Sequence, residues 1–360
     1  MRDRQNASRL RTMGEREEMA SLFDRAVEAI LSSDKDLDES LVQGLSDASR
    51  SQARAFRSQI ARCSTARRQD LFRRMVDLAE RRFELDFVWL FRACLEDDDA
   101  TVRRLCIEGL WEDERPDLAP RLVDRLLNDS DVDVRAAAAS ALGRFVYMAE
   151  GDELEPDLGA RIRVALESVI MQGEDIEVIR RAVESMGFIN DARARAIIED
   201  AYEHDAQSMR ESAMFAMGRS GDSYWGDTIM MELRAAAPAM RYEAARAAGE
   251  VMHRPAVTRL IELVDDPVAE VRSMAVWALG QIGGKRARAV VERLLDGPDE
   301  VLAAAAEDAL SELEFAAGTM EMFVHEFSDD DTLILDDYAS PDDDDDELDD
   351  DWDGDALRLP

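Results

Sequence analysis

A phrase of about thirteen residues recurs through most of this chain, and it constrains the fold more than any other feature. Each copy has an acidic turn, a Val-Arg or related pair, an Ala and a small-Leu-Gly ending, as in DVDVRAAAASALG (131–143) and VAEVRSMAVWALG (268–280). Weaker copies end at Trp111, Gly187, Gly218, Gly249 and Ser311. Successive ends are 32, 44, 31, 31, 31 and 31 residues apart, so the chain repeats a unit of about 31 residues.

Each phrase predicts a helix with one buried stripe. Counting from its first apolar residue, apolar or small residues fall at offsets 0, 4, 7 and 8, which is the spacing of one helical face. Offset 4 is always small, as close helix packing requires: Cys106, Ala138, Ala182, Ala213, Ala244, Ala275 and Ala306. The Gly that ends most phrases predicts a left-handed cap at the end of the helix.

A second apolar stretch lies between successive phrases, and each is long enough for a second helix. These stretches are 118–129, 160–172, 192–203, 227–236, 256–266 and 287–297. A helix pair cannot bury both of its faces alone, so the pairs must stack on one another. The sequence therefore predicts an all-α fold, a right-handed α-solenoid of about seven helix pairs. We call the helix of the phrase helix B and the helix before it helix A.

Over residues 97–315 this pattern resembles the HEAT-repeat family, in particular the short HEAT-like repeats of the phycobiliprotein-lyase type. The resemblance implies that helix B lines the concave face of the solenoid. It also implies a ladder in which an Asp of the turn bonds the Arg of the following helix B. The ladder pairs implied here are Asp97 with Arg103, Asp129 with Arg135, and Asp266 with Arg272.

The parts outside the regular repeats divide the chain further. Residues 1–36 are predicted to form an arm and one helix, and residues 37–96 divergent helices that cap the solenoid. The long step of 44 residues predicts an exposed acidic insertion loop at 144–159. From 316 to 360 the acidic runs and small apolar content predict a disordered tail.

Charge limits the kinds of partner. The formal net charge is -36, and residues 326–360 hold 17 acidic residues against one Arg. Binding of free nucleic acid is disfavoured, because that affinity comes mainly from Lys and Arg. Between Arg50 and Arg92, however, 11 Arg face five acidic residues. The tail is therefore solubilising, a linear motif, or a ligand of a basic surface in cis or in trans, for which this stretch is one candidate.

Neither a signal peptide nor an apolar stretch of membrane-spanning length is visible, so we expect a cytoplasmic protein with no membrane contact. The sequence offers no constellation for catalysis, metal binding or a cofactor. Its three histidines, His204, His253 and His325, are too few for the di-iron sites of HEAT-like hydroxylases. An enzyme of the lyase or hydroxylase type, bilin lyase-like or oxidoreductase, is the alternative, and it would carry colour or iron.

The side of helix B opposite the buried stripe is the predicted binding surface. On three consecutive copies it carries Phe215, Tyr242, Arg246 and Trp277. Aromatic residues and Arg are the usual anchors of protein interfaces. The alternative is that these rings pack sideways against neighbouring helices. We predict a non-catalytic interaction scaffold or assembly chaperone that binds a protein segment there.

Overall fold

The computed structural model describes residues 22–32 and 37–327, with side chains up to Phe315. Every regular element in these ranges is a helix, which confirms the predicted all-α class. The helices alternate along the chain between two layers, called here layer A and layer B. An unlabelled helix over residues 22–31 precedes them.

Layer B contains the helices of the repeated phrase, preceded by two helices of the divergent N-terminal segment 37–96. Its members are α2 (Glu39–Gln43), α4 (Thr65–Arg81), α6 (Ala100–Glu108), α8 (Val132–Glu150), α10 (Ile176–Met186), α12 (Gln207–Arg219), α14 (Pro238–Glu250), α16 (Ala269–Ile282) and α18 (Glu300–Phe327). From α2 to α16, each helix of this layer packs against the next one in the layer.

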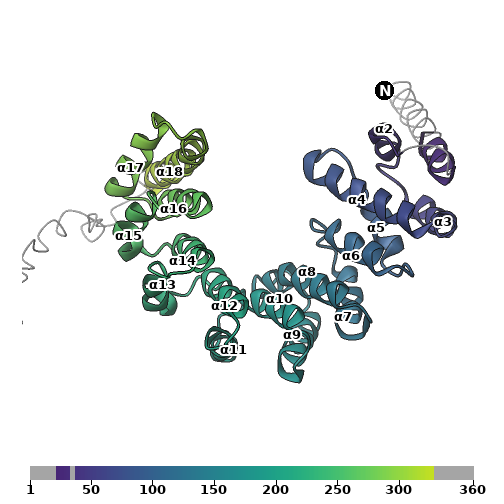
Figure 1. The fold of residues 1–360 in the computed structure, drawn as a ribbon, viewed down its shortest axis with the longest axis horizontal. Helices are drawn as coiled ribbons and strands as arrows, with labels where there is room; N and C mark the ends of the chain where they lie inside the picture. The colour runs from purple at the N-terminus through teal and green to yellow at the C-terminus, as the bar shows by residue number, and fades with distance from the viewer. Residues whose placement is uncertain (1–21, 33–36, 328–360) are drawn as a thin grey trace, which may run out of the picture. The chain divides into compact units, whose positions relative to one another are not determined.

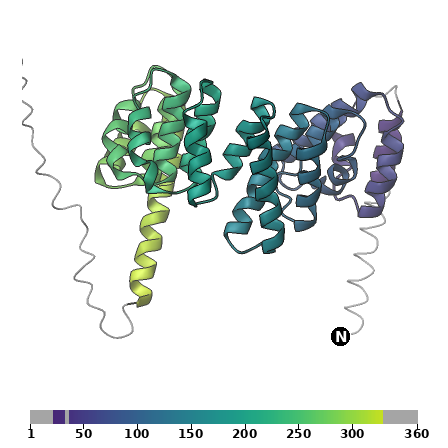
Figure 2. The same ribbon diagram turned by 90° about the horizontal axis from the view of Figure 1, so that it is seen from below.

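Layer A contains the helices between the phrases. They are α3 (Arg50–Ile60), α5 (Val88–Cys94), α7 (Ala119–Asn128), α9 (Pro156–Gln172), α11 (Ala192–Tyr202), α13 (Gly226–Glu232), α15 (Val257–Leu263) and α17 (Lys285–Leu295). Short 3-10 turns precede three of them: η1 (Pro116–Leu118), η2 (Ser223–Trp225) and η3 (Arg254–Ala256). Figure 1 shows the two layers from α6 to α16, and Figure 2 shows the same helices standing side by side. The predicted helix pairs are therefore confirmed.

Acidic residues start some of the layer B helices. Asp99 accepts a hydrogen bond from the backbone N–H of Val102 at the start of α6, and Asp131 accepts one from Val134 at the start of α8. Asp175 accepts one from Glu177 at the start of α10. A carboxylate at this position satisfies an N–H that has no partner within the helix, and it is favoured by the helix dipole.

One continuous apolar core runs between the layers, from Phe23 to Ala309. The small residues at offset 4 of the repeat all lie within it without exposed surface. The predicted buried stripe of helix B is thus confirmed. This compact unit ends at Leu310, and the part of α18 that follows belongs to a second compact unit.

The repeated glycines have a different role from the predicted one. Gly143, Gly218, Gly249 and Gly280 lie inside helices, and Gly187 has a right-handed φ of -58° at the end of α10. In the third to sixth copies of the phrase, a Cβ added to this glycine would lie 2.7–3.0 Å from the Cα of an alanine in the next layer B helix. These pairs are Gly187–Ala216, Gly218–Ala247, Gly249–Ala278 and Gly280–Ala309. The prediction of left-handed caps is wrong, because the glycine serves close approach between repeats.

The ladder connects neighbouring repeats as well as the residues of one repeat. Arg103 donates through Nε and Nη2 to the carboxylate of Asp129, at 2.8 and 2.7 Å, while its Nη1 donates to the backbone carbonyl of Asp97. The carboxylate of Asp97 instead accepts from Arg68 at 3.0 Å. Asp97 and Arg103 are therefore bonded as predicted, but through the backbone carbonyl of Asp97 and not through its carboxylate.

The other two predicted pairs differ in the same way. Arg135 donates to the backbone carbonyl of Asp129, and Arg272 to that of Asp266. The carboxylate of Asp266 accepts from Arg241 of the preceding repeat, at 2.7 and 2.9 Å. All six predicted residues belong to the ladder, but each carboxylate faces back toward the Arg that precedes it by one repeat.

Two predicted irregular segments are helical instead. Most of the insertion at 144–159 lengthens α8 to Glu150 and starts α9 at Pro156, so the prediction of a loop is wrong. The reason is that Phe145 and Val146 continue the buried stripe of α8. The tail predicted from 316 is also helical as far as Phe327, because the dense acidic run begins only later. Residues 328–360 lie outside the described residues, as do residues 1–21.

Candidate functional site

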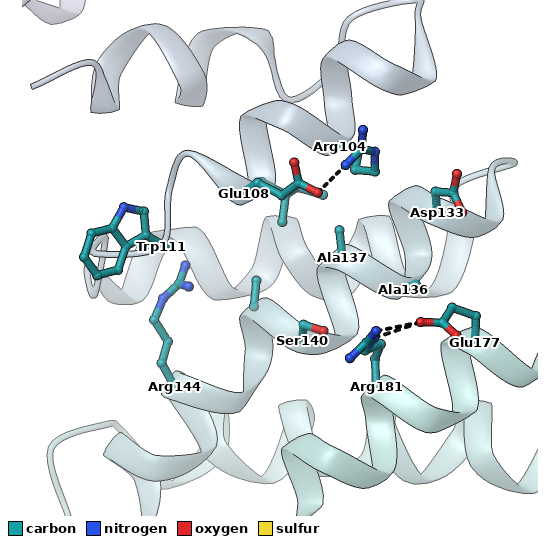
Figure 3. A pocket seen from close by; sticks show the side chains of 12 residues that line it. Arg104, Glu108, Trp111, Asp133, Ala136, Ala137, Ser140, Arg144, Glu177 and Arg181 are labelled. Atoms are coloured by element: carbon teal, nitrogen blue, oxygen red, sulfur yellow. Dashed lines mark hydrogen bonds and ion pairs between the residues drawn. The ribbon is translucent and has the colours of Figure 1, made fainter. Parts of the chain in front are cut away.

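A groove of about 610 Å³ lies on layer B across α6, α8 and α10. Its floor on α8 consists of small side chains: Ala136, Ala137, Ser140 and Ala141. We call it the α8 groove, and Figure 3 shows its lining. Because no long side chain rises from this part of α8, a partner can approach the helix backbone closely.

Charged side chains of the neighbouring helices form the walls of the α8 groove. On α6, Arg104 forms an ion pair with Glu108. On α10, Arg181 forms an ion pair with Glu177, with 2.9 Å between Nη2 and Oε1. These pairs cancel most of the charge of the walls, so the groove combines a small apolar floor with polar rims that can accept or donate hydrogen bonds.

The end of the α8 groove is formed by Trp111 and Arg144 (Figure 3). The indole of Trp111 is 53% exposed, an unusual exposure for the largest apolar side chain. Burial lowers the pKa of Arg144 to about 10. The Nε of Arg144 donates to the backbone carbonyl of Asp113, but its buried Nη2 has no hydrogen-bond partner among the described residues. Such a donor is costly to leave unsatisfied, so an acceptor supplied by a ligand would be favoured.

The four anchor residues predicted from the sequence lie further along layer B. Arg246 lies 3.9 Å above the ring of Phe215, which is a close cation–π contact. Arg246 is only 8% exposed and is held by Glu243 and Glu250. The structure thus brings Phe215 and Arg246 together, but Arg246 is already paired with two carboxylates of its own helix.

The remaining two anchors are partly buried against the core. Trp277 lies over Gly249, so that a Cβ added to that glycine would be 2.6 Å from the indole ring. The ring also lines a groove of about 680 Å³ that includes Phe188 and Met252. Tyr242 packs against the core and does not line this groove. Sideways packing, the alternative considered from the sequence, therefore describes most of the contacts of these four residues.

Potential metal ligands do not cluster among the described side chains. No cluster of three or more His, Cys, Asp or Glu with metal-binding geometry occurs among them, and His325 lies outside that set. Burial lowers the pKa of His253, which packs against Gly226. Within the described part of the chain, no helix is both long and apolar enough to span a membrane.

The α8 groove was missed from the sequence, although a signal for it exists. At offsets 2 and 6 of helix B, α8 carries Ala136 and Ser140, whereas α6 carries Arg104 and Glu108 at the same offsets. A small pair flanked by long charged pairs predicts a depression on the exposed side of layer B. Trp111, which replaces the Gly of the repeat, is a second signal.

Several solved structures are similar to this chain. Human deoxyhypusine hydroxylase in complex with glycerol is 17% identical, with 84% of this chain and 99% of that chain covered and a TM-score of 0.32. The CpcE–CpcF complex of phycocyanin lyase from Nostoc sp. PCC7120 is 16% identical, with 63% and 95% covered and a TM-score of 0.43. Importin beta is 13% identical, with 82% and 44% covered and a TM-score of 0.42.

No curated protein matches the sequence. The family model for HEAT repeats matches residues 88–157 and 227–311. These two ranges contain the clearest copies of the repeated phrase, together with their A–B helix pairs and two of the arginine–aspartate contacts that connect neighbouring repeats. The chain therefore contains HEAT repeats over residues 88–157 and 227–311.

Proposed function

We propose that this chain is a non-catalytic interaction scaffold, or assembly chaperone, that binds a segment of a partner protein in the α8 groove. The proposal rests on three features that occur together at one end of this groove. The exposed indole of Trp111 lies beside the guanidinium group of Arg144, whose buried Nη2 has no hydrogen-bond partner among the described residues, and the floor next to them consists of alanine and serine side chains.

These features define the segment that would fit. Its backbone or a small side chain would lie on the floor formed by Ala137 and Ser140. An apolar side chain would pack on Trp111, because burying that indole removes a large apolar surface from water. A carboxylate or carbonyl oxygen would accept from Nη2 of Arg144. The polar walls would bind the backbone of the segment, which selects a peptide rather than a small apolar ligand.

The test uses peptides selected from a random display library against the full-length protein. The selected peptide is synthesised with a fluorescent label, and its dissociation constant is measured by anisotropy. Trp111→Ala removes the apolar contact, and Ser140→Arg fills the floor with the kind of side chain that α6 and α10 carry at their walls. Each is expected to weaken binding by about tenfold or more, which corresponds to roughly 1.4 kcal/mol.

The matched control is Val164→Arg on α9 in layer A, where the side chain is 67% exposed. It adds the same charge to an exposed helical position away from the groove, so binding should not change. Selected peptides that bind Ser140→Arg as tightly as the unchanged protein would refute the α8 groove as the site. If binding is lost only in the combined variant of Phe215, Tyr242, Arg246 and Trp277, the site lies on that part of layer B instead.

The non-catalytic part of the proposal has its own measurement. The purified protein should show no visible absorbance of a bilin and no bound iron by elemental analysis. A stoichiometric chromophore or metal would contradict it and would favour the lyase or hydroxylase alternative.

A further inference from the structure

A second groove lies on layer A near the N-terminal end of the array, across α3, α5 and α7. It has a volume of about 300 Å³ and is called here the arginine groove. Five guanidinium groups and one indole dominate its lining: Arg50, Arg54, Arg57, Trp89, Arg92 and Arg121. The excess of arginine between residues 50 and 92 is thus partly gathered into a single surface.

The side chain of Arg92 at the base of the arginine groove is only 5% exposed. Its Nε and Nη1 donate to the carboxylates of Asp113 and Asp117. Its buried Nη2 has no hydrogen-bond partner among the described residues. A buried guanidinium donor without an acceptor costs free energy, and an anionic oxygen in the groove would satisfy it.

The indole of Trp89 provides a fixed wall. The guanidinium carbons of Arg50 and Arg115 lie 4.1 and 4.4 Å from the centre of its ring, and that of Arg92 lies 5.4 Å away. These cation–π contacts hold Arg50 in place at the rim. Less side-chain entropy is therefore lost when an anion binds to it.

Positive charge in the arginine groove is only partly compensated. Glu96 lies 3.3 Å from Arg57 and 3.5 Å from Arg121, and its side chain is 53% exposed. Together with Asp113 and Asp117, which pair with Arg92, three carboxylates lie against five guanidinium groups. Burial lowers the pKa of Arg121; the charges of Arg92 and Arg57 lower it further, while Glu96 acts in the opposite direction. A further anion in the groove would compensate the remaining positive charge.

The spacing of the exposed arginines on α3 suits an extended chain. Arg50 and Arg54 are four residues apart, which is about 6 Å along a helix axis. In an extended peptide, side chains on one face repeat about every 6.6 Å. Carboxylates at alternate positions of such a peptide can therefore meet successive guanidinium groups, and the bidentate geometry of Arg favours carboxylate as a ligand.

We infer that the arginine groove binds an extended, Asp- or Glu-rich segment of a partner protein. This surface lies on layer A and is independent of the α8 groove on layer B. A nucleic acid fits less well, because its dense charge continues beyond the groove along a chain whose formal net charge is -36. A short acidic peptide keeps its charge within the groove.

The experiment measures binding of a fluorescein-labelled peptide of six Asp-Ser repeats to the full-length protein by anisotropy. Arg54→Gln/Arg57→Gln removes two exposed charges of the groove and is expected to weaken binding about tenfold. The control Arg62→Gln/Arg73→Gln removes two exposed arginines outside the groove, so the net charge is the same. Binding to the control should stay within about twofold of the unchanged protein, and all three proteins should have the same helicity.

Three results would overturn the inference. The first is equal weakening by both double variants, which would show general electrostatic attraction. The second is a labelled twelve-residue oligothymidine that binds at least as tightly and depends equally on Arg54 and Arg57. The third concerns the acidic sequence of the chain itself. The aspartates at 342–346 are changed to asparagine, both in the unchanged protein and in the Arg54→Gln/Arg57→Gln variant. If this change raises affinity for the probe tenfold only when both arginines are present, the occupant of the groove is that sequence and not a partner.

Discussion

Substitution of Gly187 by alanine tests the inferred role of the repeated glycine. The added Cβ would lie 2.7 Å from the Cα and 2.9 Å from the carbonyl oxygen of Ala216, both backbone atoms of α12. Optimal contacts between carbon atoms are about 3.5–4.0 Å, so α10 and α12 would have to separate by about 1 Å. Overpacking of this kind costs about 1–3 kcal/mol.

A smaller effect acts in the opposite direction. The backbone of Gly187 is right-handed, so alanine also restricts the unfolded chain, which stabilises by about 0.4–1 kcal/mol. The expected net loss is about 1–2 kcal/mol, or a decrease in Tm of about 2–6 °C. Thermal and urea unfolding followed by circular dichroism would measure it. Hydrogen exchange should localise the change to α10 and α12, since repeats interact mainly with their neighbours.

The matched control is Gly151→Ala. A Cβ there would meet its nearest atom at 3.6 Å, which is an ordinary contact, and φ is -85°. Stability should be unchanged or slightly higher. If Gly187→Ala is as stable as the unchanged protein, or if Gly151→Ala is destabilised as much, close approach of the helices is not the reason for the glycine.

Three further outcomes follow from buried charges and thiols. Asp129→Ala leaves Arg103 buried without its partner carboxylate, so the free energy of unfolding measured in urea should fall by about 3 kcal/mol. A decrease below about 1 kcal/mol would contradict a stabilising role of the ladder. Burial alone would raise the pKa of Asp129, but its hydrogen bonds and the charge of Arg103 lower that pKa overall. Its contribution to stability is therefore present above pH about 4 and is lost as the pH falls through the lowered value. Urea unfolding between pH 6 and 3 should show this loss, and Asp129→Asn should show less of it. Burial raises the pKa of Cys94 to about 12 and that of Cys106 well above its usual range, whereas Cys63 is only half-buried. A thiol reagent should thus modify Cys63 first, and a Cys63→Ser variant should react only on unfolding.

The surface of layer B was only partly predictable. Helical spacing identified which residues lie outside the buried stripe, and it correctly placed Phe215 and Arg246 on neighbouring helices. The exposed fraction of these side chains could not be predicted from the spacing. Arg246 is buried because Glu243 and Glu250, three and four residues away, lie within reach of its guanidinium group. Helical spacing identifies potential local partners, but the rotamers and packing in the fold decide their contacts and exposure.

The period of the repeat and the helical pairs were determined by the sequence itself. A stripe of apolar residues at helical spacing is a local property, and a small residue at the same offset of every copy, such as Ala138 and Ala244, indicates close packing. The continuation of α8 was also readable in Phe145 and Val146, once the predicted Gly cap at Gly143 is set aside.

Contacts between repeats were decided only by the tertiary structure. Asp129 is six residues from Arg135 and 26 residues from Arg103, so distance along the chain favours Arg135 as its partner. The stacking of the helices instead places the carboxylate of Asp129 against Arg103. The glycine that ends four of the phrases, from Gly187 to Gly280, likewise has no visible reason within its own helix. Its reason is an alanine 29 residues later, whose backbone comes within contact distance only after two repeats have packed together.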